Sequence, residues 1–532
     1  MRAMAWRIGA ATVMLGLLAS AGPAAAQKSG GTLRVYHIDN PPSASVHEEA
    51  TITTAMAFMP VFNNLVMFGQ THRQDRLDDI VPDLASSWSW SQDNTKLTFV
   101  LRQGVTWHDG KPFTAKDVKC TFDSVLDRND NKLRKNPRKA WYFNLNEVTT
   151  ESDHQVTFHL GRPQPSFMAM LATVFTGIYP CHVPMRDMRV KPVGTGPFKV
   201  AEFKPNELIR LVRNDKYWQP GLPYLDGIEF TIITNRSTRI LGFIAGQFDM
   251  TFSQDVTVPL LKDVHAQAPH AICELRPSNS HGNLMVNRDK PPFDNGRVRR
   301  AMMLAIDRSA FVDILSEGKA DIGGAMLPPP EGLWGMPKEM LRGVTGFDPD
   351  VAKSRAEGQK IMRELGYNPE KPLKIKVTTR NLPTYRDPAV LLIDHLKHVH
   401  IEGELEVLDS SIWYTRMLRK DYQVGLNVTG VAIDDPDVNF YENYGCDSER
   451  NYTQYCNKDL EALFHKQSAM TDVEERRRLV REIDRQLQED GARPVFYHTR
   501  QATCWQPHVK AMLMNNNSQY NHWRFDTVWL DK

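Results

Sequence analysis

Apolar residues along this chain follow two periods that replace each other repeatedly. Alternation of apolar and polar residues predicts a β-strand, and apolar residues three or four apart predict one face of an α-helix. The predicted strands are 31–36, 98–102, 156–160, 198–203, 283–286, 373–378, 405–408 and 425–428. The predicted helices follow Thr114, Asn295 and Thr471 or span 351–365 and 390–400. Strands that alternate with helices favour an α/β fold.

Local signals predict where some of these helices begin and end. Thr114 is followed three residues later by Asp117, and Thr471 by Glu474, which is the spacing of a capping box. Gly491 follows the last apolar residues of the helix after Thr471 and should end it.

The first 26 residues have the layout of a secretory signal peptide. Residues 1–7 carry two arginines, 8–18 form an apolar run, and Ala24 and Ala26 form a small-residue cleavage site. We expect cleavage after Ala26, which leaves 506 of the 532 residues as a soluble secreted protein of two or more lobes. The remaining chain has no other apolar run near the roughly 20 residues that cross a bilayer. The alternative is a buried N-terminal helix.

Composition and charge exclude some classes of partner. Hydrophobic residues make up 41% of the chain and charged residues 24%, so the chain can form ordinary globular cores. There are 65 Lys and Arg against 63 Asp and Glu, and loss of Arg2 and Arg7 with the signal peptide balances the two sets. A balanced surface argues against nucleic acid and against anionic membranes as main partners.

Three stretches carry a longer signature. Residues 84–123 contain LASSW, TFVLR, GVTWHDG and PFTAKDV in that order. TGPF at 195–198 leads into a strand, RNDKYW and YLDGIEF, and 283–308 reads NLMVNRDKPPFDNGRVRRAMMLAIDR. The chain thereby resembles the extracytoplasmic solute-binding proteins of ABC importers, in family 5, the branch that binds peptides, opines, nickel and related solutes. The resemblance spans nearly the whole mature chain.

The resemblance implies a two-lobe periplasmic-binding-protein fold of the type II, large form, with an extra subdomain in lobe one. The expected parts are the core of lobe one in 27–60, 190–275 and 500–532, the extra subdomain in 61–189, and lobe two in 276–499. It implies that a monomer binds a solute between its lobes, without a cofactor, and delivers it to a membrane permease. An oligopeptide is the default solute; opines, glycosides and nickel complexes are alternatives.

The six cysteines suit an oxidising compartment and allow 15 pairings. Cys446 and Cys456 flank a short polar loop, and two more lie in one region before any crossing between lobes. This leaves Cys273 and Cys504, near the two implied crossings between the lobes, where a disulfide would link the two crossing segments. We expect the disulfides Cys120–Cys181, Cys273–Cys504 and Cys446–Cys456. A metal site is the alternative, although the chain has no CxxC.

The segment 429–445, TGVAIDDPDVNFYENYG, is the best candidate for the cleft. In peptide-binding members of the family, an Asp four residues before the Pro of this segment anchors the ligand's α-amino group. Here Pro436 is that Pro, and Ala432 occupies the anchor's position. The replacement weakens the case for free-amino peptides, since a buried ammonium without a partner is costly. Asp434 or Asp435 could substitute after a small shift, or the two acids shape a turn before Pro436.

Aromatic residues supply a second candidate. Trp413 and Tyr414 lie between a predicted strand and a helix, where such residues stack on a ligand in this family. Large apolar residues are more often core, and that is the alternative. Residues 279–281, before the strand 283–286, are a weaker candidate.

The predicted loop 379–387 is a third candidate because it carries Arg380, Tyr385 and Arg386 after a strand. A guanidinium can bind a carboxylate or phosphate through two hydrogen bonds. A solvated loop with internal ion pairs is the alternative.

Enzymatic interpretations find little support. His395, His398 and His400 could bind a metal on one helix, but no HExxH frame is present and a His-rich exposed helix end is favoured. The sequence also has no G-x-S-x-G nucleophile elbow. We expect a carrier with no metal and no catalytic residue; a secreted metal-dependent hydrolase is the minor alternative.

Overall fold

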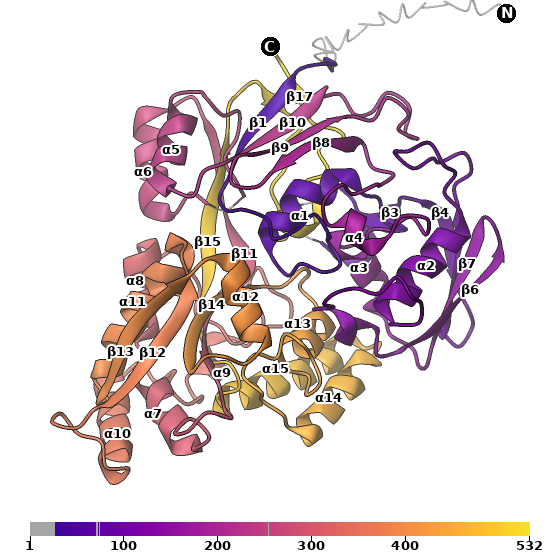
Figure 1. Cartoon of the computed structure of the whole chain (residues 1–532). Coiled ribbons are helices and arrows are strands. Elements are labelled where there is room, and N and C mark those ends of the chain that lie inside the picture. The colour runs from indigo at the N-terminus through magenta and orange to yellow at the C-terminus, as the bar shows by residue number, and fades with distance from the viewer. Residues whose placement is uncertain (1–26, 71–72, 74, 254) are drawn as a thin grey trace, which may run out of the picture.

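The chain folds into two lobes, each built around its own sheets (Figure 1). This computed structural model describes residues 27–532 except 71, 72, 74 and 254, and it leaves out the side chains of 518 and 519. The predicted signal peptide, 1–26, lies outside the described residues. The first lobe contains two four-stranded sheets, and the second contains a five-stranded sheet.

The first sheet of the first lobe has the strand order β1-β10-β9-β8. Its strands are β1 (Thr32–His37), β8 (Phe198–Lys204), β9 (Leu208–Arg213) and β10 (Gly227–Ile232). Strand β1 is parallel to β10, and the other pairs are antiparallel. The helices of this part are α1 (Ile52–Phe58), α5 (Arg236–Ile244) and α6 (Val258–Gln267). Ile209 and Leu211 of β9 point into the core while Arg210 is exposed, as alternation requires.

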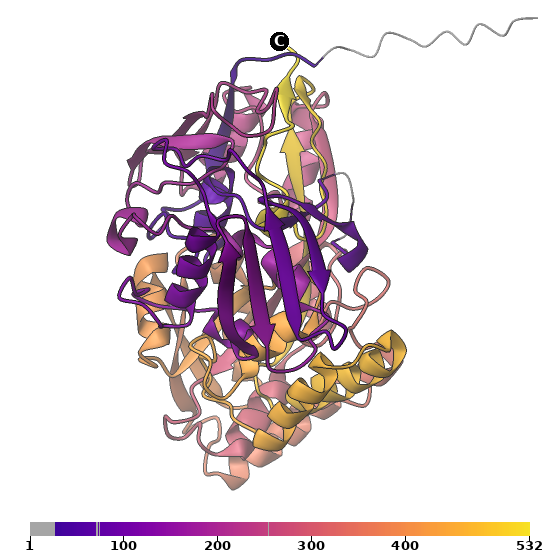
Figure 2. The same ribbon diagram turned by 90° about the vertical axis from the view of Figure 1, so that its right-hand side faces the viewer.

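The second sheet of the first lobe is antiparallel and is seen face-on in Figure 2. Its strands, in the order β4-β5-β7-β6, are β4 (Ala85–Trp90), β5 (Lys96–Leu101), β7 (Gln155–Leu160) and β6 (Leu145–Ser152). Helix α2 (Ala115–Val125) contacts β6 and β7. The capping box of Thr114 and Asp117 is confirmed. The side chain of Thr114 accepts a hydrogen bond from the backbone N–H of Asp117, and the side chain of Asp117 accepts one from the backbone N–H of Thr114.

The second lobe has the strand order β13-β12-β14-β11-β15. Its strands are β11 (Ile272–Val286), β12 (Leu373–Arg380), β13 (Ile401–Leu408), β14 (Val424–Gly430) and β15 (Val495–Trp505). Its helices are α7 (Gly296–Ala305), α8 (Arg308–Ser316), α9 (Lys338–Leu341), α10 (Val351–Glu364), α11 (Pro383–Lys397), α12 (Ser410–Leu418), α13 (Pro436–Tyr444), α14 (Lys458–Ser468) and α15 (Val473–Glu489). The α/β fold predicted from the alternating periods is confirmed.

Shorter elements complete the fold. They are β2 (Val66–Phe68), β3 (Ile80–Pro82), β16 (Val509–Lys510), β17 (Trp529–Leu530), α3 (Phe167–Leu171), α4 (Met185–Met188), α16 (Ser518–Asn521) and the 3-10 turns η1 (Met59–Val61), η2 (Leu77–Asp79), η3 (Lys139–Tyr142) and η4 (Val174–Thr176). In the part of the chain that the structure describes, no helix combines the length and hydrophobicity needed to span a bilayer.

The chain passes between the lobes along β11 and β15, which lie side by side as antiparallel partners (Figure 1). Their pairing is interrupted between Pro277 and His281 of β11, opposite Arg500 and His498 of β15. The six cysteines form the three expected disulfides, Cys120–Cys181, Cys273–Cys504 and Cys446–Cys456. The second of these joins the two crossing strands at directly opposed positions.

Three predicted boundaries are wrong. Helix α15 is capped by Asp472, whose side chain accepts a hydrogen bond from the N–H of Glu475, so the capping box of Thr471 is not used. Helix α11 begins at Pro383, so Tyr385 and Arg386 lie in its first turn and not in a loop. Trp413 and Tyr414 lie within α12 and not between elements.

Candidate ligand-binding site

A cavity of about 540 Å³ lies between the two lobes, within the range of small-molecule sites. The first lobe lines it with residues from β2, η2 and α3, and the second lobe with the loop after β14 and the start of α15. Lining residues include Phe68, Leu77, Ala169, Asn279, Trp334, Asp434 and Arg476. A ligand held there would touch both lobes at once.

The lobes also contact each other directly. Ser166 of the first lobe donates a hydrogen bond to Asp437 of α13 at 2.6 Å, and Arg236 donates to Thr384 of α11 at 2.9 Å. Ser410, at the start of α12, donates to Asp39, which follows β1. The arrangement is therefore closed, with polar contacts from several elements spanning the two lobes.

Ala432 lies at the junction of the lobes. It is buried, and with its neighbours it packs into the hydrophobic cluster of the first lobe although it follows β14 of the second. Its carbonyl accepts a hydrogen bond from Asn521 at 2.9 Å. A side chain at nearby Gly430 would lie 2.1 Å from the hydroxyl of Tyr520, so the backbone approaches that ring as only glycine allows. The position of the expected amine anchor is thus occupied by apolar packing.

The carboxylate of Asp435 is held by hydrogen bonds within the protein. Its carboxylate accepts two hydrogen bonds from Arg476, at 2.9 and 3.0 Å, and a third from the N–H of Asp437, with which it caps α13. Burial raises the pKa of Asp435, and the charge of Arg476 opposes that rise. These hydrogen bonds occupy both carboxylate oxygens, so Asp435 stabilises the fold and has no oxygen left for a ligand.

Asp434 is different, because half of its carboxylate is unused. Oδ2 accepts a hydrogen bond from the N–H of Leu333 at 2.8 Å, and Oδ1 is buried with no partner among the described residues. Burial and the nearby Asp435 raise the pKa of Asp434 to about 7. A carboxylate that lines a cavity with a free oxygen is suited to accept a cationic group.

Arg380, Tyr385, Trp413 and Tyr414 lie together in the second lobe. The guanidinium carbon of Arg380, at the end of β12, lies 3.5 Å from the ring centre of Tyr385, 5.3 Å from that of Tyr414 and 5.5 Å from that of Trp413. Arg380 is buried, and its Nε has no hydrogen-bond partner among the described residues. Arg386 does not join this group: its side chain is 46% exposed and lies near Asp387.

Two groups of histidines can be placed. His281 of β11 is buried, both ring nitrogens lack partners among the described residues, and burial lowers its pKa well below the ordinary value. His395 packs edge-on against Phe311, whereas His398 is exposed. Across the described ranges, no set of three or more metal-binding side chains comes together.

Sequence reasoning missed three residues near Arg380. Arg138 precedes η3, Arg450 follows α13, and Tyr520 lies in α16. Burial raises the pKa of Tyr520 to about 12, and Arg450, Arg138 and Arg380 all oppose that rise. These residues come from both lobes and from the C-terminal tail, so no local sequence pattern could have grouped them.

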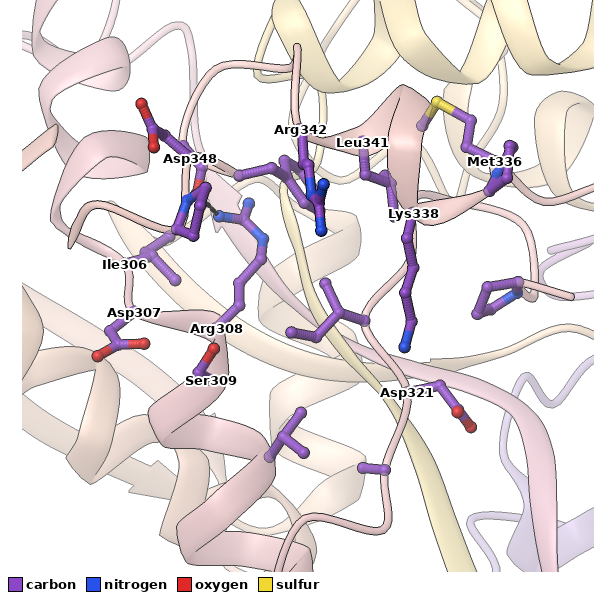
Figure 3. Close-up of a pocket in the computed structure, with 18 of the residues that line it drawn as sticks. Ile306, Asp307, Arg308, Ser309, Asp321, Met336, Lys338, Leu341, Arg342 and Asp348 are labelled. Carbon is purple, nitrogen blue, oxygen red and sulfur yellow. Dashed lines mark hydrogen bonds between the residues drawn. The ribbon is translucent and has the colours of Figure 1, made fainter.

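A further cavity, of about 590 Å³, lies within the second lobe. Arg308 of α8, Lys338 of α9 and Arg342, which follows α9, surround it (Figure 3). Arg308 packs its guanidinium carbon 3.7 Å from the ring centre of Phe347 and donates to the carbonyl of Val495 at 2.8 Å. All of the residues that line this cavity fall between 306 and 351. Its walls therefore do not depend on how the two lobes are arranged.

The family follows from comparison with known proteins. The sequence model described as Bacterial extracellular solute-binding proteins, family 5 Middle, matches residues 79–451. This chain belongs to that family. Its two-lobe α/β fold is the fold of the family's solved structures.

Known proteins resemble this chain in sequence over most of its length, and solved structures resemble it in fold. Probable di/tripeptide-binding protein 5 of Pseudomonas aeruginosa (strain UCBPP-PA14) is 27% identical over 520 residues, which cover 91% of this chain and 93% of the relative. Di/tripeptide-binding protein 1 of the same strain is 24% identical, covering 85% of each chain. Haemophilus influenzae OppA, solved in complex with RPPGFSPFR, has a TM-score of 0.84 at 19% identity and covers 95% of this chain and 99% of its own.

Proposed function

We propose that this protein captures an oligopeptide between its lobes in the periplasm and delivers it to the membrane permease of an ABC importer. The observation that carries the proposal is the cavity of about 540 Å³ whose walls come from both lobes. Two relatives named as di/tripeptide-binding proteins support the peptide as solute. The protein acts as a monomeric carrier rather than an enzyme, and residues 1–26 direct export and are removed after Ala26.

Binding works through closure. For this proposal we keep the lobe boundaries expected from the sequence: 27–60, 61–189, 190–275 and 500–532 on one side, and 276–499 on the other. A peptide that contacts both sides stabilises the closed arrangement by its differential affinity for it. The closed protein is then the form that docks on the permease.

Each candidate residue has a role in this proposal. Arg380 does not line the cavity of about 540 Å³ itself. It binds the terminal carboxylate of a peptide that extends beyond this cavity, because its buried guanidinium has a donor without a partner among the described residues. Asp434 receives the α-ammonium through its free Oδ1, in place of an anchor at Ala432. Trp413 and Tyr414, with Tyr385, form the aromatic wall that holds Arg380 in place.

The test is a thermal-shift screen of the mature protein, stripped of ligand, against peptides of two to five residues, opines, glycosides and nickel chelates. A ligand at 100 times its Kd adds about 2.7 kcal/mol of stability, which such a screen detects. We expect shifts with peptides and not with the other classes. A response to opines, glycosides or chelates alone would refute the peptide assignment.

A variant pair locates the site. Arg380→Gln should weaken peptide binding by at least about tenfold, since a hydrogen bond to a charged group contributes about 1.5–3 kcal/mol. Arg478→Gln, at a position 75% exposed on α15, is the matched control and should bind as the wild type does. Equal affinities of the two variants in isothermal titration would remove Arg380 from the site.

A further inference from the structure

The centre of the closed protein contains more buried positive charge than its own acids balance. Arg138, Arg380, Arg450 and Arg493 are all buried. Arg450 forms an ion pair with Glu442. Arg493 uses its donors on uncharged amide oxygens, those of Asn283 at 2.9 Å and Asn443 at 2.8 Å.

Arg138 stands out within this group. Its Nη1 donates to the backbone carbonyl of Glu49 at 3.0 Å, and its Nε has no partner among the described residues. Its guanidinium carbon lies 3.1 Å from the ring centre of Phe175. Burial, and after it the charge of Arg450, lowers the pKa of Arg138 to about 9. No carboxylate in the described part of the chain forms an ion pair with it, although buried charges are ordinarily paired.

The three acids of the first lobe closest in sequence to the Arg138 contact at Glu49 already have partners. The carboxylate of Glu49 binds Arg134 and Lys135, and that of Glu48 binds Arg189. Asp39 accepts the hydroxyl of Ser410, and burial raises the pKa of Asp39 against the opposing effects of Ser410 and Arg380. The excess of positive charge is therefore left for a group from outside the chain.

Aromatic contacts connect Arg138 to the candidate site. Phe175, beneath Arg138, lies 5.5 Å from Tyr520 between ring centres, and Tyr520 touches the end of β14 at Gly430. Arg380 and Tyr414 lie near the carboxyl ends of the same sheet. Arg138 belongs to the first lobe and Arg380 to the second, and in the closed arrangement both charges oppose the rise in the pKa of Tyr520, which lies between them in this chain of contacts.

We propose that Arg138 is a second anion-binding residue of the site and that the solute is an acidic peptide, with a side-chain carboxylate at Arg138 in addition to the terminal carboxylate at Arg380. This inference rests on the proposed function and narrows its solute class. An anion between the lobes offsets the repulsion that closure creates, so it couples recognition of charge to closure. A neutral peptide of the same size leaves Arg138 buried and unpaired.

The experiment uses tripeptides that differ by one charge. The mature protein is titrated with three matched pairs, Glu-Ala-Ala and Gln-Ala-Ala, Ala-Glu-Ala and Ala-Gln-Ala, Ala-Ala-Glu and Ala-Ala-Gln, at fixed ionic strength. We expect at least one Glu peptide to bind ten or more times tighter than its Gln partner. In Arg138→Gln that ratio should fall below three.

Two further variants keep the result interpretable. Arg138→Lys retains the charge and should keep a Glu preference above threefold, so it serves if the Gln variant does not fold. Arg186→Gln removes an arginine that is 79% exposed in the same lobe and should leave the ratio unchanged.

The two proposals fail in different ways. Wild-type protein that binds the tripeptides with all three ratios below three overturns the acidic specificity and leaves peptide binding standing. An unchanged Glu preference in Arg138→Gln removes Arg138 from the site. Wild-type protein that binds none of the six peptides overturns the proposed function, and the acidic specificity with it.

Discussion

Asp434 makes the stability of the ligand-free protein fall as the pH rises. Its pKa is raised from 3.8 to about 7 by burial and by the neighbouring Asp435. Below about pH 4 the carboxyl is protonated in both the folded and the unfolded chain and has no effect on the pH dependence. Between about pH 4 and pH 7 the unfolded chain releases its proton more readily, so unfolding becomes easier as the pH increases.

The magnitude follows from the size of the shift. A rise of about three pKa units corresponds to about 4 kcal/mol, at 1.36 kcal/mol for each unit. The side chain lines a cavity and is only partly shielded, so we expect about half of this, roughly 2 kcal/mol, above pH 7. Asp434→Asn removes the charge and keeps an oxygen for the N–H of Leu333, so it should recover that free energy.

The assay is urea unfolding of wild type and Asp434→Asn at pH 4, 5.5, 7 and 8, without ligand. The variant should match the wild type at pH 4 and exceed it by about 2 kcal/mol at pH 8. Asp215→Asn, at an exposed position, is the control and should show no such trend. A difference that is constant across the range, or that grows toward low pH, would refute the electrostatic reasoning.

Two other substitutions test the packing of the fold. Arg476→Met leaves Asp435 without its ion-pair partner and should lower the free energy of unfolding in urea by about 3–5 kcal/mol. Arg478→Met, on the exposed face of α15, is the control and should change it little. Equal effects of the two substitutions would contradict the role of the ion pair. Gly194→Ala places a methyl group 1.8 Å from the carbonyl oxygen of Val61 and should lower stability by about 3 kcal/mol, measured in the same way; a change under about 1 kcal/mol would show that the backbone yields there.

Much of the fold could be predicted because its signals are local. The capping box at Thr114 was found from spacing alone, since it needs only four consecutive residues. The start of α11 was missed: Pro383 is tolerated in the first turn, where its missing N–H is not needed, and the helix continues through Pro388. At α15, Asp472 took the capping role one residue after Thr471, a competition that spacing cannot decide.

The site was predictable only in part. The segment after β14 was singled out by its acids, and the structure places Asp434 at the cavity between the lobes. The distinction between Asp434 and Asp435 depends on Arg476, which lies 41 residues away from Asp435 along the chain. Arg138 and Tyr520 come from distant segments with no motif of their own, so only the folded chain brings them near Arg380.

The paired crossing strands restrict how the lobes can move. Two antiparallel strands bonded to each other and locked by Cys273–Cys504 resist twisting and sliding, much as a door hinge does, but they can bend where the ladder is interrupted between Pro277 and His281. Motion is thereby reduced to essentially one coordinate, from open to shut. Any solute that closes the protein then produces the same outer surface. A membrane partner can therefore recognise the ligand-bound protein without contacting the ligand.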